Sequence, residues 1–577
     1  MTKKQKITSI VLAISFVVML VLYFAVLSPL VNEVVEDIKQ SLNLDDGEVE
    51  GANNRVMLFE QVERANMKSI EVHNEHGTFR FVRDKDGNFI IEGNPTTSYD
   101  PQLFSQLVTD CGYTLSEAKV ANNNPDKLSD YGLDEASNPA YYILTTKEDK
   151  VHKVYIGSVI PSTGGYYVKY EGRNTVYVLD ETLETTVLAP IEAFVTPTIV
   201  FPTTITTYFM INDLAIYKGS YYFQDLELDK DDKDDKDKTD SSDTSADTSA
   251  QTDNEQSGEA DGDNSSSEDK KPVEKIDPIV RFHYLDEKNR PSYNKNQTFY
   301  MDYPGNGVYV PSGYLDGVLQ LFIAYEGSET IKLDPTDEDL KSYGLIDADY
   351  TLYLINNTSG VDEKGVTQYV PVLNVVYYSV LHEGEDGEVA FRYAYSVLFD
   401  TIVKVPYYDC EFLTYDLNLW VNNSLYNYNI MDVSSIKIES NKINVDFSIT
   451  GGEDTNGDGS SDTAFVFKDN NGHVAIESNF KKFYQVILRL QKGGYVNMTD
   501  EELAAYIADE NNLTARMTVT MESGKVLEYC FYSYGVQCYY TINGEGEFYV
   551  PTAQVNKVIS DAIRVTKDEI VYPDNAY

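Results

Sequence analysis

The residue types and spacing that come closest to a chemical site lie in residues 454–462, which run Asp-Thr-Asn-Gly-Asp-Gly-Ser-Ser-Asp. Oxygen-bearing side chains stand at the first, third, fifth and ninth positions, and a glycine stands at the sixth. Calcium loops share this pattern, because a hard cation prefers oxygen ligands and the chain must turn sharply around it. The candidate metal ligands are Asp454, Asn456, Asp458, Ser460 and Asp462.

The same stretch departs from a calcium loop in two respects. Its twelfth position is Phe465, so the glutamate that normally supplies two ligands is missing. Strand-like residues, 443–449 and 464–467, replace the usual flanking helices. Two interpretations therefore stay open, a polar hairpin tip and a weak extracellular calcium site. We expect no other cofactor.

Catalytic motifs are missing from the sequence. The six histidines are scattered, and His73 and His76 would point to opposite faces of a strand. There is no His-Glu-x-x-His, no Gly-x-Ser-x-Gly and no phosphate-binding glycine loop. Residues 478–481 fit Ser-x-x-Lys, but so short a pattern arises by chance, and Asn479 resembles a helix cap. The sequence therefore predicts a protein that is not an enzyme.

One apolar run near the N-terminus indicates where the chain works. Residues 7–27 are apolar apart from Thr8, Ser9 and Ser15, and the run is long enough to cross a bilayer as one helix. Lysines precede the run, so the positive-inside bias keeps residues 1–6 in the cytoplasm. A cleavable signal peptide is the alternative, but its apolar region would be shorter and a cleavage site would follow. We expect a single-pass signal anchor in the cell membrane, with the bulk of the chain extracellular.

Composition limits the classes of partner. A chain of 577 residues with 42% hydrophobic residues is large enough for several domains. The net charge of −47 excludes nucleic acid as a partner, because phosphate binding needs clustered lysine and arginine. The four cysteines are too few for a disulfide-built scaffold. Cys530 and Cys538 flank a turn at 533–535 that would place them opposite each other, either as a disulfide or as two buried thiols.

The elements that would position these residues are hairpins and short helices. Apolar residues alternate over 70–91 across two turns, which predicts antiparallel strands. Asp100 and Pro101 then predict a helix start, as N-cap and first helical residue. The following motif, Asp-x-Leu-x-x-Tyr-Gly-Leu, spans residues 126–133. We interpret it as a short helix closed by a left-handed glycine, and a binding role as the minor alternative.

This plan recurs along the chain. Tyr-Gly-Leu returns at 343–345 with the same offset from a preceding leucine. A weaker copy reaches Tyr506, where Ile507 and Ala508 replace Gly-Leu. The long-period repeat predicts an α+β protein in which an N-terminal transmembrane helix precedes three β-rich repeats, each of antiparallel hairpins with short helices.

We divide the chain accordingly. A stalk at 28–55 follows the anchor, and the repeat domains are 56–204, 205–430 and 431–577. Residues 229–275 contain hardly an apolar side chain, so they cannot offset the entropy of folding. We expect them to form a disordered acidic insertion at a loop tip of the second domain.

The anchor, the repeated units and the tyrosine-rich edge at 165–168 resemble a bacterial family of domains of unknown function. The resemblance is best over residues 68–189, fair over 312–356 and weak in the last third. It implies an extracytoplasmic, membrane-anchored protein of the bacterial envelope, associated with ABC-type transport components of the gliding-motility kind. A permease and an ATPase are the partners it implies, and it supplies no catalytic residues.

Two functions follow as expectations. The first is a non-enzymatic accessory or scaffold subunit that works outside the cell with an ABC-type transporter. The second is an anchored binding module for cell-wall or extracellular polysaccharide, which the 46 tyrosines favour because their rings can stack on sugars. A wall-active hydrolase is the third and weakest class.

Overall fold

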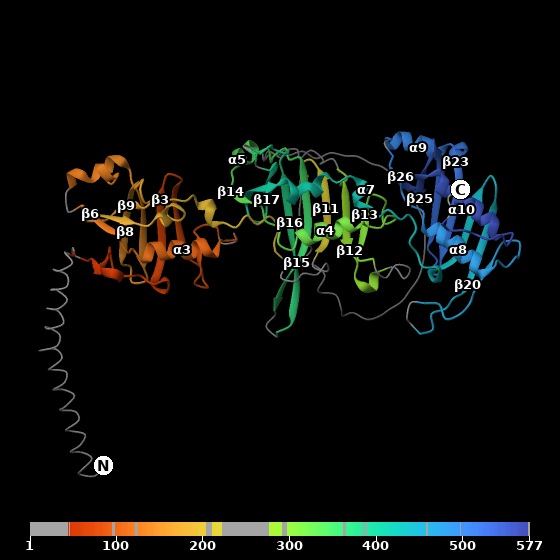
Figure 1. Ribbon diagram of the computed structural model, residues 1–577, viewed down its shortest axis with the longest axis horizontal. Coiled ribbons are helices and arrows are strands. Elements are labelled where there is room, and N and C mark those ends of the chain that lie inside the picture. Colours follow the sequence, from red (N-terminus) through yellow and green to blue (C-terminus); the bar gives the residue numbers. More distant parts are fainter. Residues whose placement is uncertain are drawn as a thin grey trace, which may run out of the picture. The chain divides into compact units, whose positions relative to one another are not determined.

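The computed structural model describes most of the chain after the expected anchor (Figure 1). The described residues are 44, 47–94, 98–121, 125–202, 211–221, 276–290, 297–361, 365–384, 387, 389–456, 460–496 and 498–574. The expected anchor at 7–27 and the expected insertion at 229–275 lie outside them. Among the described residues, no helix is both long and apolar enough to cross a membrane.

The described part of the chain contains three eight-stranded sheets with one shared topology, preceded by a two-stranded sheet of β1 (Val49–Glu50) and β2 (Val56–Met57). If the strands of each sheet are numbered one to eight along the chain, all three sheets have the spatial order 3-2-1-5-6-7-8-4. In each sheet a helix connects the third strand to the fourth. The prediction of an α+β fold with three β-rich repeats of antiparallel hairpins and short helices is therefore confirmed.

The first sheet spans residues 67–179. Its strands are β3 (Met67–Asn74), β4 (Gly77–Arg83), β5 (Phe89–Ile91), β6 (Ala118–Ala121), β7 (Ala140–Thr146), β8 (Val151–Val159), β9 (Tyr166–Tyr170) and β10 (Val176–Leu179). Its helix is α3 (Pro101–Gly112). Alternate residues of β7, such as Tyr142 and Leu144, are buried in one core with Leu107 and Val108 of α3. The other face of the sheet is only half-buried along β3, β7 and β8.

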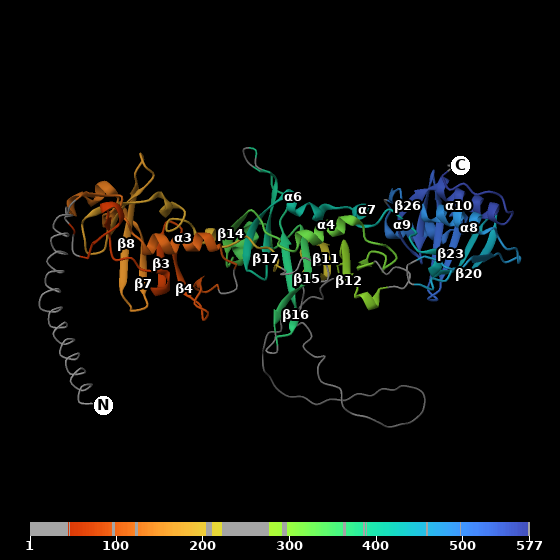
Figure 2. The same ribbon diagram turned by 60° about the horizontal axis from the view of Figure 1, so that its bottom comes forward.

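The second sheet follows the same plan over residues 211–406. Its strands are β11 (Ile211–Lys218), β12 (Val280–Tyr284), β13 (Phe299–Tyr303), β14 (Glu329–Leu333), β15 (Tyr350–Val361), β16 (Thr367–Tyr378), β17 (Phe391–Ser396) and β18 (Thr401–Pro406). Its helices include α4 (Gly313–Leu321) and α5 (Asp337–Ser342). Figure 2 shows the long strands β15 and β16 reaching past the rest of this sheet.

The third sheet spans residues 433–551. Its strands are β19 (Val433–Ser440), β20 (Asn444–Gly451), β21 (Phe465–Lys468), β22 (Gly494–Tyr495), β23 (Leu513–Met521), β24 (Val526–Tyr534), β25 (Gln537–Ile542) and β26 (Glu545–Pro551). The helices α8 (Glu477–Leu488) and α10 (Thr552–Val565) lie side by side (Figures 1 and 2). Asn479 is buried inside α8, so the expectation that it caps a helix is wrong; Ile476 occupies that position.

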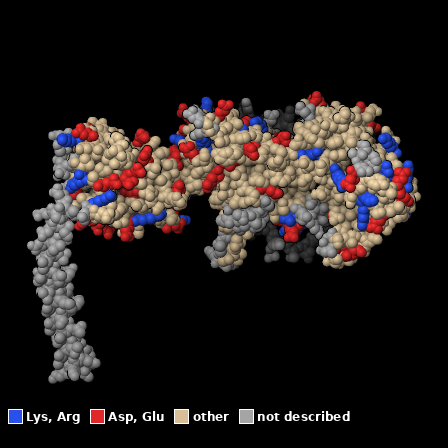
Figure 3. Space-filling model, viewed as in Figure 1, with Lys and Arg blue, Asp and Glu red and all other residues tan. Residues whose placement is uncertain are grey.

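The chain also divides into two compact units. The described residues of one unit fall within 1–206, 320–345 and 356–412, and those of the other within 207–319, 346–355 and 413–577. The first sheet belongs to the first unit and the third sheet to the second. Acidic and basic side chains are interspersed over the face of the described molecule in Figure 3.

Local signals explain several element boundaries. The Asp100 carboxylate accepts hydrogen bonds from the backbone N–H groups of Gln102 (2.8 Å) and Leu103 (3.0 Å), which confirms the predicted N-cap of α3. Gly132 and Gly344 have φ of +67° and +69°, so both copies of the motif end in the predicted left-handed cap. The third copy lacks a glycine, and its helix α9 (Asp500–Ala508) therefore continues through Ile507 and Ala508.

The two C-terminal cysteines are buried free thiols, and no disulfide joins them. The turn between their strands contains only two residues, because Tyr534 pairs with Gln537. This register places Cys538 opposite Ser533 and Cys530 opposite Thr541. The expectation of a three-residue loop at 533–535 that brings the thiols opposite each other is thus wrong, because the two-residue turn at 535–536 moves the partner of Cys538 three residues along β24, from Cys530 to Ser533.

Candidate functional site: a polar pocket beside the first Tyr-Gly-Leu turn

The first Tyr-Gly-Leu turn packs directly on the first sheet. The 3-10 helix η4 (Pro125–Tyr131) delivers the turn. The Tyr131 ring meets the Tyr167 ring of β9 edge-on, with centroids 4.8 Å apart. Leu133 is buried against Leu128 and Val176. The motif therefore has a structural role in closing η4 onto the sheet.

A glycine on β8 permits this close approach. A Cβ atom at Gly157 would lie 2.2 Å from the carbonyl oxygen of Tyr131 and 2.9 Å from Cγ of Leu133. A Cβ atom at Gly132 would lie 2.6 Å from the Ser158 hydroxyl. Because a side chain at either position would overlap these atoms, the two glycines let the backbone of the turn pack directly on the backbone of β8. The Ser158 side chain lies at the edge of the turn.

A pocket of about 660 Å³ opens beside this turn. Its polar wall comes from the end of β3, from the segment between η4 and β7, and from β8. The polar side chains that line it are His73, Glu75, Ser129, Ser137, Asn138 and Ser158. Its apolar patch consists of Pro139, Ala140, Ile156 and Leu188. The volume lies in the range that small-molecule sites occupy.

The wall at the end of β3 is held rigidly. The buried Asn74 amide donates to the carbonyl oxygens of Val187 and Ala189, both at 2.9 Å. The same side chain accepts a hydrogen bond from the backbone N–H of His76 at 2.9 Å. Nδ1 of His73 lies 2.6 Å from Oγ1 of Thr78, which fixes the imidazole ring. The pocket is thus largely formed before any ligand arrives.

In the second domain the space that corresponds to this pocket is closed by a shorter segment. There only four residues, 346–349, separate Leu345 from β15, whereas six residues, 134–139, separate Leu133 from β7. The Ser220 hydroxyl donates to the Ile346 carbonyl oxygen (2.6 Å) and accepts from the Ala348 N–H (2.7 Å). The shorter segment, 346–349, is therefore hydrogen-bonded to Ser220 just after the end of β11. In the first domain the two extra residues form part of a 3-10 turn, η5 (Glu135–Ser137), and line the pocket.

A row of ring and basic side chains crosses the half-buried face of the first sheet, on the side opposite α3. Direct cross-strand pairing aligns its members, which we call the ring-and-cation row: Thr78, His73, Tyr141, Tyr155 and Lys169. The His73 ring stacks on the Tyr141 ring at 4.8 Å. His73 belongs to this row and to the pocket, so the two features are continuous.

Lys153, in the adjacent position on β8, connects the tyrosines of the row. Its Nζ lies 4.1 Å from the Tyr141 ring centroid and 4.7 Å from the Tyr155 ring centroid. Burial lowers the pKa of Lys153, but contacts with Tyr155, Glu171 and Tyr141 outweigh this effect and raise its pKa overall. The ammonium is therefore charged at neutral pH and is held between rings rather than free in solvent.

The predicted calcium ligands lie in the connection between β20 and β21, which pair as a hairpin. The Asp462 carboxylate accepts hydrogen bonds from Thr455 N–H (2.8 Å) and Thr455 Oγ1 (2.6 Å). A side-chain hydrogen bond from Thr455 chiefly lowers the pKa of Asp462. Asp454, Asn456 and Ser460 belong to the same connection, while Asp458 lies outside the described residues. Within the part of the chain that is described, no group of three or more acidic, histidine or cysteine residues is arranged to hold a metal. The calcium site stays a prediction.

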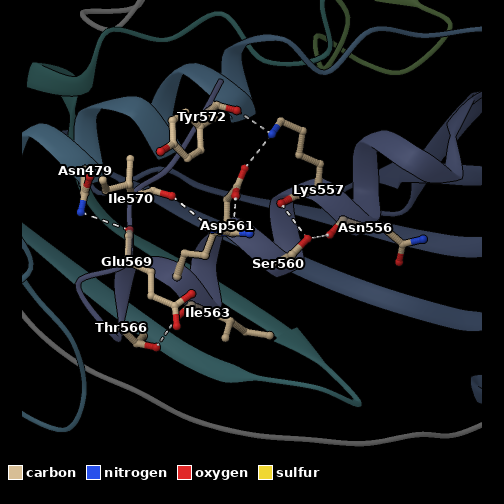
Figure 4. A network of polar contacts seen from close by, with 11 residues as sticks. Asn479, Asn556, Lys557, Ser560, Asp561, Ile563, Thr566, Glu569, Ile570 and Tyr572 are labelled. Atoms are coloured by element: carbon tan, nitrogen blue, oxygen red, sulfur yellow. Dashed lines mark hydrogen bonds and ion pairs between the residues drawn. The ribbon is translucent and has the colours of Figure 1, made fainter. Parts of the chain in front are cut away.

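A buried ionic network in the third domain has a structural role (Figure 4). The fully buried Asp561 carboxylate lies 3.0 Å from Lys557 Nζ and 3.5 Å from Arg564 Nε. Lys557 also donates to the Tyr572 carbonyl oxygen at 2.8 Å, and Asn479 donates to the Glu569 carbonyl oxygen at 3.2 Å. These contacts fasten the segment after α10 across α8 and α10.

Sequence reasoning found the turn but missed the pocket beside it. Ser158 and Asn138 belong to no motif, and they meet only because β8, the turn and the segment before β7 converge. The one usable signal is the spacing from Tyr-Gly-Leu to the next strand, which is two residues longer in the first copy than in the second.

Comparison with known proteins gives one match. Residues 108–258 match the model of a family described as a domain of unknown function, DUF4340. The matched range contains the Tyr-Gly-Leu turn, β7 and β8, while His73 precedes it. Searches of curated proteins and of solved structures found no match.

Proposed function

We propose that the protein is a non-enzymatic accessory or scaffold subunit that works outside the cell with an ABC-type transporter and is anchored in the membrane by residues 7–27. The ring-and-cation row is the observation that carries this proposal. Tyrosine-rich surfaces with interspersed cations are typical of protein interfaces. The DUF4340 match supports the family resemblance from which the transporter association comes.

The chemistry of the row indicates what kind of surface it would meet. Lys153 and Lys169 both lie against Tyr155, with Nζ atoms 4.7 Å and 5.0 Å from the ring centroid. Their charges are thus held in place on an otherwise acidic chain. We infer that the partner surface is an acidic extracytoplasmic loop of the permease, since opposite charges guide association and fix the docking geometry.

Affinity purification of the full chain from native membranes tests this proposal. We expect the permease and the ATPase to be recovered together with it. Lys153→Glu should sharply reduce that recovery, because it reverses a charge in the middle of the proposed contact. Lys437→Glu is the matched control on β19, where Lys437 is 38% exposed, and should leave recovery unchanged. Purification that never yields transport subunits, or yields them equally with Lys153→Glu, would count against the proposal.

The pocket favours a second candidate, an anchored binding module for cell-wall or extracellular polysaccharide. Its polar wall and apolar patch suit a ligand with both hydroxyl groups and an apolar ring face. Pull-down of the full chain with purified wall material separates the two candidates, because a transporter subunit need not bind the wall. No retention on any wall polymer would remove this candidate.

A further inference from the structure

We propose that the pocket of the first domain binds a short, uncharged saccharide of about two sugar units. This inference rests on the second proposed function and narrows it to one site and one class of ligand. Four properties of the pocket support it: the polar wall without lysine or arginine, the apolar patch, the absence of a free strand edge at the strands behind the pocket, and the fixed framework.

The charge of the wall excludes anionic ligands. The groups that line the pocket are hydroxyls, amides, one imidazole and the Glu75 carboxylate, and none of the lining residues is lysine or arginine. Binding of phosphate or carboxylate normally uses those two residues, often as a bidentate arginine contact. Glu75 would also repel an anion. An uncharged ligand with many hydroxyl groups matches a wall of hydroxyl and amide groups, which can both donate and accept hydrogen bonds.

The apolar patch supplies the second half of the recognition. Pro139 and Ala140 lie at the start of β7, and Leu188 comes from the segment after β10. These three are partly exposed, while Ile156 beneath them is 2% exposed and belongs to the core. Burying the apolar face of a sugar ring on these side chains would contribute favourable free energy, while the ring hydroxyls face the polar wall. The volume of about 660 Å³ is large enough for more than one ring.

A peptide ligand fits this site less well. Extended peptides bind most often by adding a strand to an exposed sheet edge. The strands behind the pocket are internal: β7 lies between β3 and β8, and β8 lies between β7 and β9. No unpaired backbone is therefore offered by these strands, and recognition must come from side chains.

Two positions allow the site to be tested without disturbing the fold. Ser158 is exposed at the pocket wall, so Ser158→Trp would fill the pocket rather than the core. Asn138 has φ of +46°, a left-handed conformation that glycine adopts without strain. Asn138→Gly would therefore remove the amide and keep the backbone. Ser533 is exposed on β24 of the third domain, close to the α9 turn as Ser158 is to the first, and Ser533→Trp is the matched control.

The experiment is a titration of the full chain in detergent, followed by saturation-transfer NMR and calorimetry. The probes are di-N-acetylchitobiose, cellobiose and maltose, with a glucuronate-containing disaccharide and a tetra-alanine peptide as contrasts. We expect at least one uncharged disaccharide to bind. Ser158→Trp should weaken that binding by about tenfold or more, because the indole ring would occupy the pocket. Asn138→Gly should weaken it by about three- to tenfold, because it removes the hydrogen bonds of the amide; on the scale of about 1.4 kcal/mol per tenfold this is about 0.7–1.4 kcal/mol. Ser533→Trp should bind as the unmodified chain does.

Three results would overturn the inference: no binding of any uncharged disaccharide, preference for the acidic sugar or the peptide, or unchanged binding in both pocket variants. Retention on wall polymer, measured in parallel, separates failure of this inference from failure of the proposed polysaccharide-binding function. If polymer binds equally well to Ser158→Trp, polysaccharide binding stands and this site is wrong. If neither polymer nor disaccharide binds, the polysaccharide-binding function and the pocket inference are both wrong.

Discussion

Tyr131 and Tyr167 meet edge to face with ring centroids 4.8 Å apart, and Tyr343 and Tyr393 repeat this contact in the second domain at the same distance. The interplanar angles are 65° and 69°. In both domains the pair joins the tyrosine of Tyr-Gly-Leu to the seventh strand of its sheet. The repeated tyrosine is therefore explained by packing, since edge-to-face contact is a favoured geometry of aromatic pairs.

The first prediction concerns this pair. Tyr131→Ala and Tyr167→Ala should each destabilise the first domain, and the double variant should lose less than the sum. The expected coupling is about 0.5–1.5 kcal/mol, the usual worth of an aromatic pair beyond its buried area. Native-state hydrogen exchange of β8 and β9 amides measures it domain by domain. Tyr131→Phe, which keeps the ring, should be nearly neutral; additive losses would show that the rings do not interact.

The second prediction concerns Gly157. Gly157→Ala should destabilise the first domain by about 1–3 kcal/mol, because the new Cβ would overlap the Tyr131 carbonyl oxygen and force the turn away from β8. Gly317 in α4 is the control, since a Cβ there meets nothing within 4 Å. Gly317→Ala should be neutral or stabilise by about 0.5–1 kcal/mol. Calorimetry of the full chain compares them, and equal effects would contradict the packing argument.

The third prediction is a loss of stability in acid caused by His152. This buried imidazole stacks on Phe59 at 4.0 Å, and burial, with smaller effects from Lys150 and Arg173, lowers its pKa to about 4. Below pH 6.5 the unfolded chain binds a proton that the folded chain excludes, so stability is lost as the pH falls from about 6.5 to about 4 and is unaffected above this window. The loss should approach about 3 kcal/mol.

Unfolding of the first domain, measured between pH 4 and 8, checks this effect. His152→Gln should flatten the pH dependence in that window, although it lowers stability at every pH by disturbing the stack. His76→Gln replaces an exposed histidine and should leave the pH profile as it was. An unaltered profile in His152→Gln would assign the acid sensitivity to other groups.

The fourth prediction concerns the buried network of α10. Asp561→Ala should destabilise the third domain by about 3–5 kcal/mol, because Lys557 would keep a buried charge without its carboxylate. Asp574 pairs with Arg489 at the surface, where its side chain is 83% exposed. Asp574→Ala should therefore cost less than about 1 kcal/mol. Thermal unfolding of the full chain, with hydrogen exchange in α10 to locate the effect, distinguishes these outcomes.

The fifth prediction is that millimolar calcium raises the melting temperature of the third domain. A loop without the glutamate at its twelfth position should bind weakly, with a Kd of about 10⁻⁴–10⁻³ M, and a bound ion stabilises the folded state by mass action. Asp458→Ala should abolish the rise. If calcium, magnesium and chelator all leave the melting temperature unchanged, the connection between β20 and β21 is only a polar hairpin tip.

The parts of the fold that the sequence predicted are those that local signals determine. Alternation over 70–91 predicted β3, β4 and β5, and Asp100 predicted the start of α3, because each depends on neighbours in the chain. The repeated motif predicted the repeated sheets. The spatial order of the strands could not be inferred, because it depends on which distant segments pair.

The pocket could not be predicted from the sequence, because it also depends on how distant segments pack together. Its position depends on a glycine at 157, which sets how closely the turn approaches β8, and on two extra residues before β7, which line the space that Ser220 bonds closed in the second domain. Cys530 and Cys538 are a second example, because their cross-strand pairing depends on the register of one hairpin. The position of their turn, at 535–536 and not at 533–535, decides that Cys538 pairs with Ser533, three residues away from Cys530.

The pairing of the fourth strand with the eighth has a consequence for the order in which each domain can be completed. β6 follows α3 early in the chain, yet among the described strands it pairs only with β10, the last strand of that domain. During synthesis or export from the N-terminus, β6 stays unpaired until β10 has emerged. The entropy of closing the chain between β6 and β10 is then lost before their pairing contributes favourable free energy. The three domains would then finish one after another, and a chain interrupted just before an eighth strand would expose the edge of the seventh to proteases and to pairing with other chains.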